Sequence, residues 1–175
     1  MKRTPWFERT FPPIEDNGLL PGILERLEGT APRLRALLAG VERSSRVEAG
    51  WSLAQEVGHL NDLEPLWLQR AGDIVEGRAN LTAADLSNRK THESDHDQWP
   101  LSEHISRFER NRMAFVSRLR DASADDLARA SKHPRLGTPM RLIDLAFFVA
   151  EHDDHHLAIL RQLKAHPTST GTPRE

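Results

Sequence analysis

The sequence predicts an all-α protein built as a four-helix bundle, and three features support that fold. Apolar residues recur at three- and four-residue spacing in four long segments, which is typical of helices with one buried face. The alternation of apolar and polar residues that marks a strand is absent from the sequence. A long polar stretch separates the second segment from the third, and it leaves the order of the helices open.

The first two helices follow from apolar spacing and from local start and stop signals. A first helix is predicted from about 21 to 39, and Pro32 should kink or split it because proline cannot donate the helical hydrogen bond. The second helix is predicted to begin at Ser52, where Ser52 and Gln55 form a capping box. Its apolar pattern fades near Gly77.

The rest of the chain is predicted to hold two more long helices. Residues 80–100 are polar, so we expect a long loop or an exposed arm there and no core element. Ser102 is predicted to cap the third helix, and residues 123–127 are predicted to form a short helical turn. Thr138 and Pro139 predict the start of the last helix, with threonine as the N-cap and proline at the first helical position.

Length and charge define the general class of protein. The 175 residues are enough for one domain, and we expect an N-terminal arm over 1–17, the bundle over 18–166 and a disordered tail over 167–175. The net charge is −2 with acids and bases interspersed, so no nucleic-acid partner is expected. The sequence has neither a signal-peptide pattern nor a run of membrane-spanning length, so we expect no membrane partner and a cytoplasmic location.

The residue types present limit the chemistry. There is no cysteine, which removes disulfides, thiolate metal ligands and a cysteine nucleophile. A metal ion would have to be held by His, Asp or Glu, and thiol chemistry would need a thiol supplied by a small molecule. The nine histidines favour a site ligated by histidine.

Two histidines in the last helix are the strongest functional signal. His152 and His156 are four residues apart near the centre of the apolar stripe, while His155 lies on its flank. Buried imidazoles need partners for their ring nitrogens, and a metal ion is a good one. The alternative is a pair of core histidines bonded to backbone or carboxylate groups. Because the two are stacked on one seam, we favour the metal.

A second pair, His92 and His96, matches the H-E-x-x-H pattern of zinc peptidases. In those enzymes the helix that carries both ligands packs inside the protein. Here the flanking residues are polar throughout, so no face of the segment should be buried. We therefore predict a solvated loop, with the alternative that His92 or His96 lies over the mouth of the real site.

A catalytic metal site usually needs a third protein ligand and an open position. The candidate is His59, on the shoulder of the second helix's apolar face, and Gly58 beside it would allow a neighbouring helix to approach closely. From the pattern alone, a shoulder histidine is more often a partly exposed surface residue. His104, His133 and His166 lack apolar partners and are predicted to be surface residues.

The order and separation of several short motifs resemble the DinB/YfiT-like superfamily, over roughly Leu20 to Leu163. The motifs are Trp51-Ser52, His59-Leu60, Asn88–Glu93, Pro139–Leu142 and Glu151–His156. Members are four-helix bundles, often dimers, with a metal held by one histidine of the second helix and an H-x-x-x-H pair of the last. Carried over, the resemblance implies that His59, His152 and His156 are the metal ligands.

The resemblance implies several activities. The superfamily includes S-transferases that use bacillithiol or mycothiol, a mycothiol-dependent maleylpyruvate isomerase, and proteins described as metal-dependent hydrolases. We expect a transferase in which a metal-bound thiol loses its proton and attacks an electrophilic carbon. The alternatives are a hydrolase that uses metal-bound water and a non-catalytic binding module stabilised by metal. Glu56, Asp62 and His155 are the candidate proton-transfer groups, and the alternative for each, which we favour slightly, is support of a metal ligand or plain solvation.

The cofactor and the assembly are also expectations. We expect a divalent transition metal, with zinc favoured by availability and nickel, manganese or iron as alternatives. The partners should be a small-molecule thiol and an electrophile. A homodimer follows mainly from the resemblance, with Trp67, Leu68, Phe147 and Phe148 as candidate interface residues. The family name refers to damage-inducible genes, hence to stress response, but the chain has no DNA-binding feature.

Overall fold

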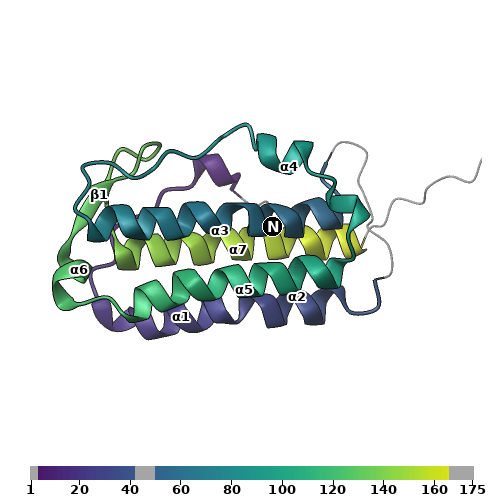
Figure 1. Cartoon of the computed structure of the whole chain (residues 1–175), viewed down its shortest axis with the longest axis horizontal. Coiled ribbons are helices and arrows are strands. Elements are labelled where there is room, and N and C mark those ends of the chain that lie inside the picture. The colour runs from purple at the N-terminus through teal and green to yellow at the C-terminus, as the bar shows by residue number, and fades with distance from the viewer. Residues whose placement is uncertain (1–3, 42–49, 166–175) are drawn as a thin grey trace, which may run out of the picture.

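Four helical segments lie side by side along the long axis of the molecule (Figure 1). The computed structural model describes residues 4–41 and 50–165. The predicted tail and His166 lie outside the described residues. The segments are α1 (Leu20–Glu28) with α2 (Thr30–Leu38), α3 (Leu53–Val75), α5 (Leu101–Arg120) and α7 (Leu142–Ala165). The predicted four-helix bundle is confirmed.

The first segment of the bundle is broken, as Pro32 predicts. Glu28 ends α1 and Thr30 begins α2, with Gly29 between them. Pro32 has no N–H to offer the carbonyl of Glu28, so the continuous hydrogen-bond ladder cannot pass this point. The break lies slightly ahead of the proline because the lost bond belongs to the preceding turn.

The helix order, which the sequence left open, is set by α3 and α5 running in the same direction. Asn61 bonds Asn111 and, further along both helices, Glu64 bonds Arg112. The α1–α2 segment and α3 each pack against both α5 and α7, so the first and second long segments lie across a diagonal. Two parallel neighbours need a connection as long as the helix itself, about 35 Å for α3. The polar stretch after α3 is this crossover.

The crossover is more ordered and more buried than predicted. It contains α4 (Arg89–Glu93) and the short 3₁₀ helix η3 (His96–Gln98). Leu81, Thr91 and His96 are buried, which corrects the expectation of a purely exposed arm. The reason is tertiary, because Thr91 and His96 both hydrogen-bond the side chain of Asp62 on α3.

A small antiparallel hairpin corrects the prediction that the chain has no strands. It pairs β1 (Ala130–Lys132) with β2 (Pro139–Arg141). Pro139 therefore lies in a strand, and α7 begins only at Leu142, so the predicted helix start at Thr138 was wrong. The last turn before α7 is fixed by Asp144, which accepts a hydrogen bond from the backbone N–H of Arg141 at 2.9 Å. Three-residue strands are too short to show alternation in the sequence.

Of the other predicted helix starts, two are confirmed and one is wrong. Ser52 caps α3 and forms the capping box with Gln55, and Ser123 caps the short helix α6 (Ala124–Ala128), both as predicted. The third long helix, α5, starts one residue before Ser102 with Pro100 as its N-cap, so the predicted serine cap was wrong.

The N-terminal segment, with η1 (Trp6–Glu8) and η2 (Asn17–Leu19), packs back onto the bundle. The Trp6 and Phe11 rings lie against Phe148 at centroid distances of 5.1 and 4.8 Å. In consequence, residues predicted to form an arm become one wall of the interior.

Two of the four candidate interface residues are part of this core. Trp67 and Phe148 are each 3% exposed, and Phe147 is only partly buried, whereas Leu68 is 39% exposed. The interface argument from Trp67 and Phe148 was therefore wrong, and the homodimer stays a prediction that rests on the resemblance.

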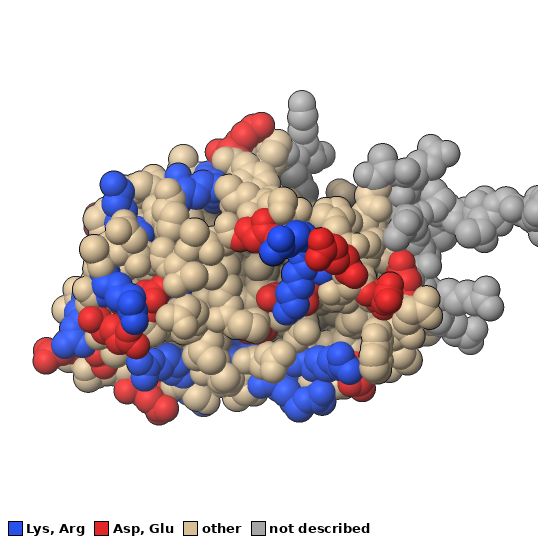
Figure 2. Space-filling view, turned by 45° about the horizontal axis from the view of Figure 1, so that its top comes forward, with Lys and Arg blue, Asp and Glu red and all other residues tan. Residues whose placement is uncertain are grey.

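The face seen in Figure 2 carries acidic and basic side chains interspersed. Within the described residues, every helix is too short or too polar to cross a membrane.

Candidate metal centre

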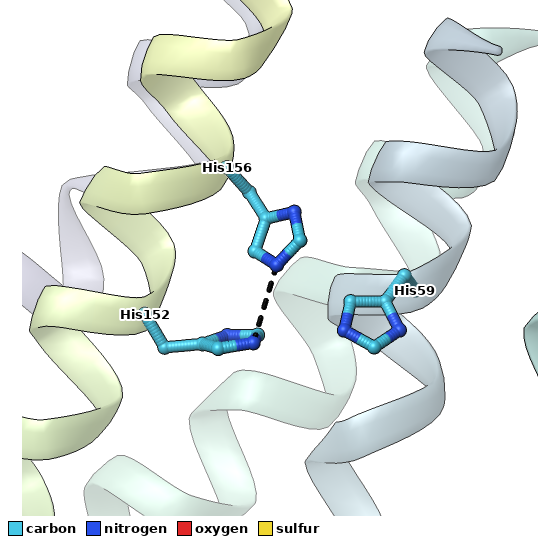
Figure 3. A group of neighbouring side chains, drawn as sticks. All are labelled: His59, His152 and His156. Atoms are coloured by element: carbon cyan, nitrogen blue, oxygen red, sulfur yellow. Dashed lines mark hydrogen bonds between the residues drawn. The ribbon is translucent and has the colours of Figure 1, made fainter. Parts of the chain in front are cut away.

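Three histidines from two helices converge in the interior. His59 comes from α3, and His152 and His156 lie one turn apart on α7, as the spacing predicts (Figure 3). They are 4%, 4% and 6% exposed. Each can direct one ring nitrogen into the cluster, and these atoms lie within 4.8 Å of one another. His59, predicted to lie on the shoulder of the apolar face of α3, is therefore buried.

The spacing of the ring nitrogens suits a single metal ion. Nε2 of His152 and Nε2 of His156 are 3.2 Å apart. Two nitrogens bound tetrahedrally to one zinc-like ion at about 2.0–2.1 Å would be about 3.3 Å apart. Two imidazole lone pairs that face each other repel unless a proton or a cation lies between them. The donor set and its geometry therefore fit a divalent ion held by three neutral imidazoles.

Glu56 orients the His156 ring. The Nδ1–H of His156 donates to Oε2 of Glu56 at 2.6 Å, which leaves Nε2 with its lone pair facing the cluster. Glu56 lies in the first turn of α3, directly after the capping box, so the start of that helix fixes its position. A carboxylate that holds the far nitrogen of a histidine is the usual support for a metal ligand.

A relay through the crossover orients His59. Its Nδ1–H donates to the hydroxyl of Thr91 at 3.1 Å, and that hydroxyl donates to Asp62 at 3.2 Å. The same carboxylate accepts from Nε2 of His96 at 3.0 Å. This tautomer of His59, inferred from the network, leaves its Nε2 for the cluster. Thr91 was missed by sequence reasoning because it lies in a segment without any periodic pattern.

The His152 ring lies between aromatic rings, and its Nε2 faces His156. Its imidazole lies 5.0 Å from the Trp6 ring and 5.7 Å from the Trp67 ring, both edge-on. Its Nδ1 is buried and has no hydrogen-bond partner in the described part of the chain. Of the three imidazoles, this one therefore has the least support for its orientation from polar groups.

Burial keeps the imidazoles of His59 and His152 neutral, the form that binds metal. Desolvation, together with the charge of His156, lowers the pKa of His59 to about 3. Complete burial lowers the pKa of His152 well below its ordinary value. Burial also raises the pKa of Glu56 to about 8. A cation at the histidines would oppose that last shift because it stabilises the carboxylate.

The three candidate proton-transfer groups differ in their surroundings. The carboxylates of Glu56 and Asp62 are engaged by His156 and by the crossover, which matches the supporting role that was their alternative. His155 is half-buried beside Trp6, and its Nδ1 lies 3.4 Å from a guanidinium nitrogen of Arg9. His155 also lines the cavity, where its ring lies 5.2 Å from that of His156.

The H-E-x-x-H segment does not form a peptidase site. His92 is in α4 and His96 is in η3, so the two do not share a helix face. His92 is exposed and lies edge-on to Trp51, whose ring is 4.7 Å from that of His59, so it borders the site as the alternative proposed. His96 is buried, contrary to the prediction of a solvated loop, because it binds Asp62.

Gly58 makes room for His96. A Cβ atom at Gly58 would lie 2.3 Å from Nδ1 of His96, closer than real contacts allow. The close approach predicted at this glycine exists, but it comes from the crossover and not from one of the long helices. His104 donates to the carbonyl of His96 and is 3% exposed, and His133 is 2% exposed. The predictions that these two are surface residues were wrong, because each has a polar partner that permits burial.

A cavity of about 450 Å³ opens onto the three histidines. Aromatic rings from the N-terminal segment, the residue before the N-cap of α3, the middle of α3 and α7 form part of its wall. The aromatic wall residues are Trp6, Phe7, Trp51, Trp67 and Phe148. Arg70, His133 and Arg135 line another part of it. These three were missed, although Arg70 follows His59, Leu63 and Trp67 at helical spacing.

Comparisons with known proteins agree with the fold. The family model described as the DinB superfamily matches residues 26–160. A solved structure, "YfiT from Bacillus subtilis is a probable metal-dependent hydrolase with an unusual four-helix bundle topology", is similar with a TM-score of 0.73 and 18% identity. The likeness covers 89% of this chain and 92% of that one. No match was found among curated protein sequences.

Proposed function

Since this chain belongs to the DinB superfamily, we propose that it is a metal-dependent enzyme that joins the sulfur of a small thiol to an electrophilic carbon. The observation that carries the proposal is that the three-histidine cluster lines a cavity large enough for a small molecule. A purely structural site would be closed by a fourth protein ligand. The described residues offer a group of three.

The residues have distinct roles in this proposal. His59, His152 and His156 would hold the ion, and Glu56 and the Thr91–Asp62 pair would keep His156 and His59 in the tautomers that bind it. When bound, a divalent cation with an open position would act as a Lewis acid that lowers the pKa of a thiol or of water. The aromatic walls would exclude bulk water from the substrates.

Thiol transfer suits the surroundings of the site better than hydrolysis. A thiol of ordinary pKa, about 8.5, needs only a small shift to ionise at neutral pH, so no protein base is required. Both nearby carboxylates already accept hydrogen bonds from other side chains. The chain has no cysteine that would compete with an external thiol for the ion.

Hydrolysis is the second candidate, favoured by one position in the site. His155 lines the cavity beside His156, with 5.2 Å between the ring centroids, where it could move a proton to a leaving group. The similar solved structure is also named as a probable metal-dependent hydrolase. We keep zinc as the favoured metal by availability, with nickel, manganese and iron as alternatives.

The test is turnover of chlorodinitrobenzene with a panel of small thiols, with metal content measured on the same protein. The thiolate sulfur would attack the ring carbon, a C–S bond would form, chloride would leave with the bonding pair, and the thiol proton would pass to solvent. We expect a rate above background with one class of thiol and its loss in His59→Ala. Thiol rates at background in both proteins, with metal-dependent hydrolysis of esters or amides, would assign the hydrolase. Metal without either activity would favour the binding module.

A further inference from the structure

One corner of the cavity carries positive charge with no carboxylate in direct ion-pair contact with it. Arg70 of α3 and Arg135, in the loop between β1 and β2, both line this corner together with His133. Within residues 4–41 and 50–165, neither guanidinium group forms an ion pair with an Asp or Glu, and Asp73 acts on Arg70 only through its charge. Asp85 also lines the cavity, but its carboxylate accepts bonds from Ser87 and the backbone of Arg89.

The Arg70 side chain is fixed in this corner by its surroundings. It is 2% exposed, its guanidinium lies over the Trp67 ring, and its Nε donates to the carbonyl of Thr82 at 2.9 Å. Burial lowers the pKa of Arg70 to about 10, so the group still carries its charge at neutral pH. Asp73 offsets this burial only in part, and an anion that made direct contact with Arg70 would lower the remaining cost in free energy.

The polar groups of this corner offer more hydrogen-bond donors than acceptors. Nδ1 of His133 faces the backbone N–H groups of Arg135 and Leu136, each at 3.2 Å, and Nε2 faces Nη1 of Arg70 at 3.1 Å. A neutral imidazole can accept at only one nitrogen, so either tautomer sets one N–H against another. Nη2 of Arg135 is buried with no hydrogen-bond partner in the described part of the chain. An oxygen anion would supply the missing acceptor.

The aromatic wall connects this corner to the histidine cluster. Trp67 contacts both ends, with its ring 5.7 Å from that of His152 and 5.4 Å from the Arg70 guanidinium. His133 in turn lies 5.3 Å from the Phe148 ring. His59 and Arg70 are on one face of α3, three turns and about 16 Å apart along its axis. A small elongated molecule could therefore touch both ends.

We propose that this corner binds the anionic group, a carboxylate or a phosphate, of a substrate whose apolar body lies along the aromatic wall toward the histidines. The proposal rests on the proposed function only in placing the reacting end of that substrate at His59, His152 and His156. The anionic end depends on Arg70, His133 and Arg135 alone, and is independent of any metal.

The experiment compares the binding of phenylpropionate, phenylpropionamide and phenylethyl phosphate. Three of the four tryptophans line the cavity, so intrinsic fluorescence reports binding, and calorimetry checks it. We expect one of the two anions to bind at least about tenfold more tightly than the amide, as a charged hydrogen bond provides. The anion that binds more tightly identifies carboxylate or phosphate as the natural group.

Variants separate this site from the metal. Arg135→Gln, whose side chain is only partly buried, should remove most of the preference for the anion, and Arg70→Gln should do the same. The control is Arg107→Gln, because Arg107 also lies over a ring, at 4.3 Å from that of Trp99, but does not line the cavity. Equal thermal melting of Arg135→Gln and the native protein would show that the fold is retained.

Two results would overturn the proposal. One is equal affinity for anions and amide, or no binding of any probe at millimolar concentration. The other is a preference for the anion that survives Arg135→Gln. A preference that disappears when a chelator removes the metal would count in the same way, because the anion would then be a metal ligand. Failure of thiol transfer or hydrolysis, with this preference intact in stripped protein, would count against the proposed function alone.

Discussion

The Oε2 atom of Glu56 lies 2.6 Å from Nδ1 of His156, although the two residues are 100 positions apart in the chain. This carboxylate decides which nitrogen of His156 faces His59 and His152. We expect Glu56→Gln to weaken metal binding about 10- to 100-fold, because the amide holds the Nδ1–H less strongly and makes the imidazole less basic. A competition titration with a chromogenic chelator measures it. The control is Glu25→Gln on the exposed face of α1, and equal affinities for all three proteins would contradict this role.

The three histidines should be separately necessary for metal. Replacing His59, His152 or His156 by alanine leaves only two imidazoles, so we expect each variant to lose most of its metal. His92→Ala is the matched control, since His92 is exposed and outside the cluster. Elemental analysis of the purified proteins gives the answer. Full occupancy in both His152→Ala and His156→Ala would refute the assignment. Loss of metal in His92→Ala, with metal retained in His59→Ala, would show that His59 is not the third ligand.

Gly58 should tolerate no side chain. In Gly58→Ala the new methyl group would push His96 away from Asp62, and we expect a loss of about 1–3 kcal/mol in the free energy of unfolding. Gly72, in the same helix, has open space around its Cβ position. Gly72→Ala should therefore stabilise α3, by about 0.5–1 kcal/mol. Urea denaturation of both variants measures the difference, and a shared sign would show that His96 is not the obstacle.

Arg112 should be critical for stability. It binds Glu64 of α3 and Asp153 of α7 while 2% exposed, so its loss would leave two buried carboxylates without a counter-charge. We expect Arg112→Met to cost about 3–5 kcal/mol. Arg35→Met, which breaks the exposed pair with Glu109, should cost at most about 1 kcal/mol. Comparable thermal midpoints for the two variants would contradict this difference.

Stability should fall in mild acid, and His133 should contribute. Burial, aided by Arg70 and Arg135, lowers the pKa of His133 to about 4, against 6.5 in the unfolded chain. A depressed histidine pKa gives stability that is complete above pH 6.5 and is lost as the pH falls toward 4, because the unfolded chain binds the proton first. Denaturation midpoints between pH 7.5 and 4.5 should fall less in His133→Gln. An NMR titration that places the His133 pKa near 6.5 would exclude this contribution.

Much of the fold could be predicted from residues that are close in sequence. Ser52 with Gln55, the break at Pro32 and the four-residue spacing of His152 and His156 all act within a turn or two of helix. The starts at Ser102 and Thr138 could not, because Pro100 caps α5 and the hairpin captures Pro139. At Pro139 the competing interaction is pairing with Lys132 of β1, which a local helix signal cannot report.

By itself, then, the sequence determined the helices, their buried faces and two histidines on one of those faces, because helical periodicity is a local property. Only the tertiary structure decided that α3 and α5 are parallel, and hence that the polar crossover returns along the bundle and brings Thr91 and His96 to Asp62. It also decided that Arg70, His133 and Arg135 meet in one cavity with the metal-binding candidates. Periodicity reports which face of a helix is buried, but not what that face meets, since contacts between distant residues depend on the packing of the whole chain.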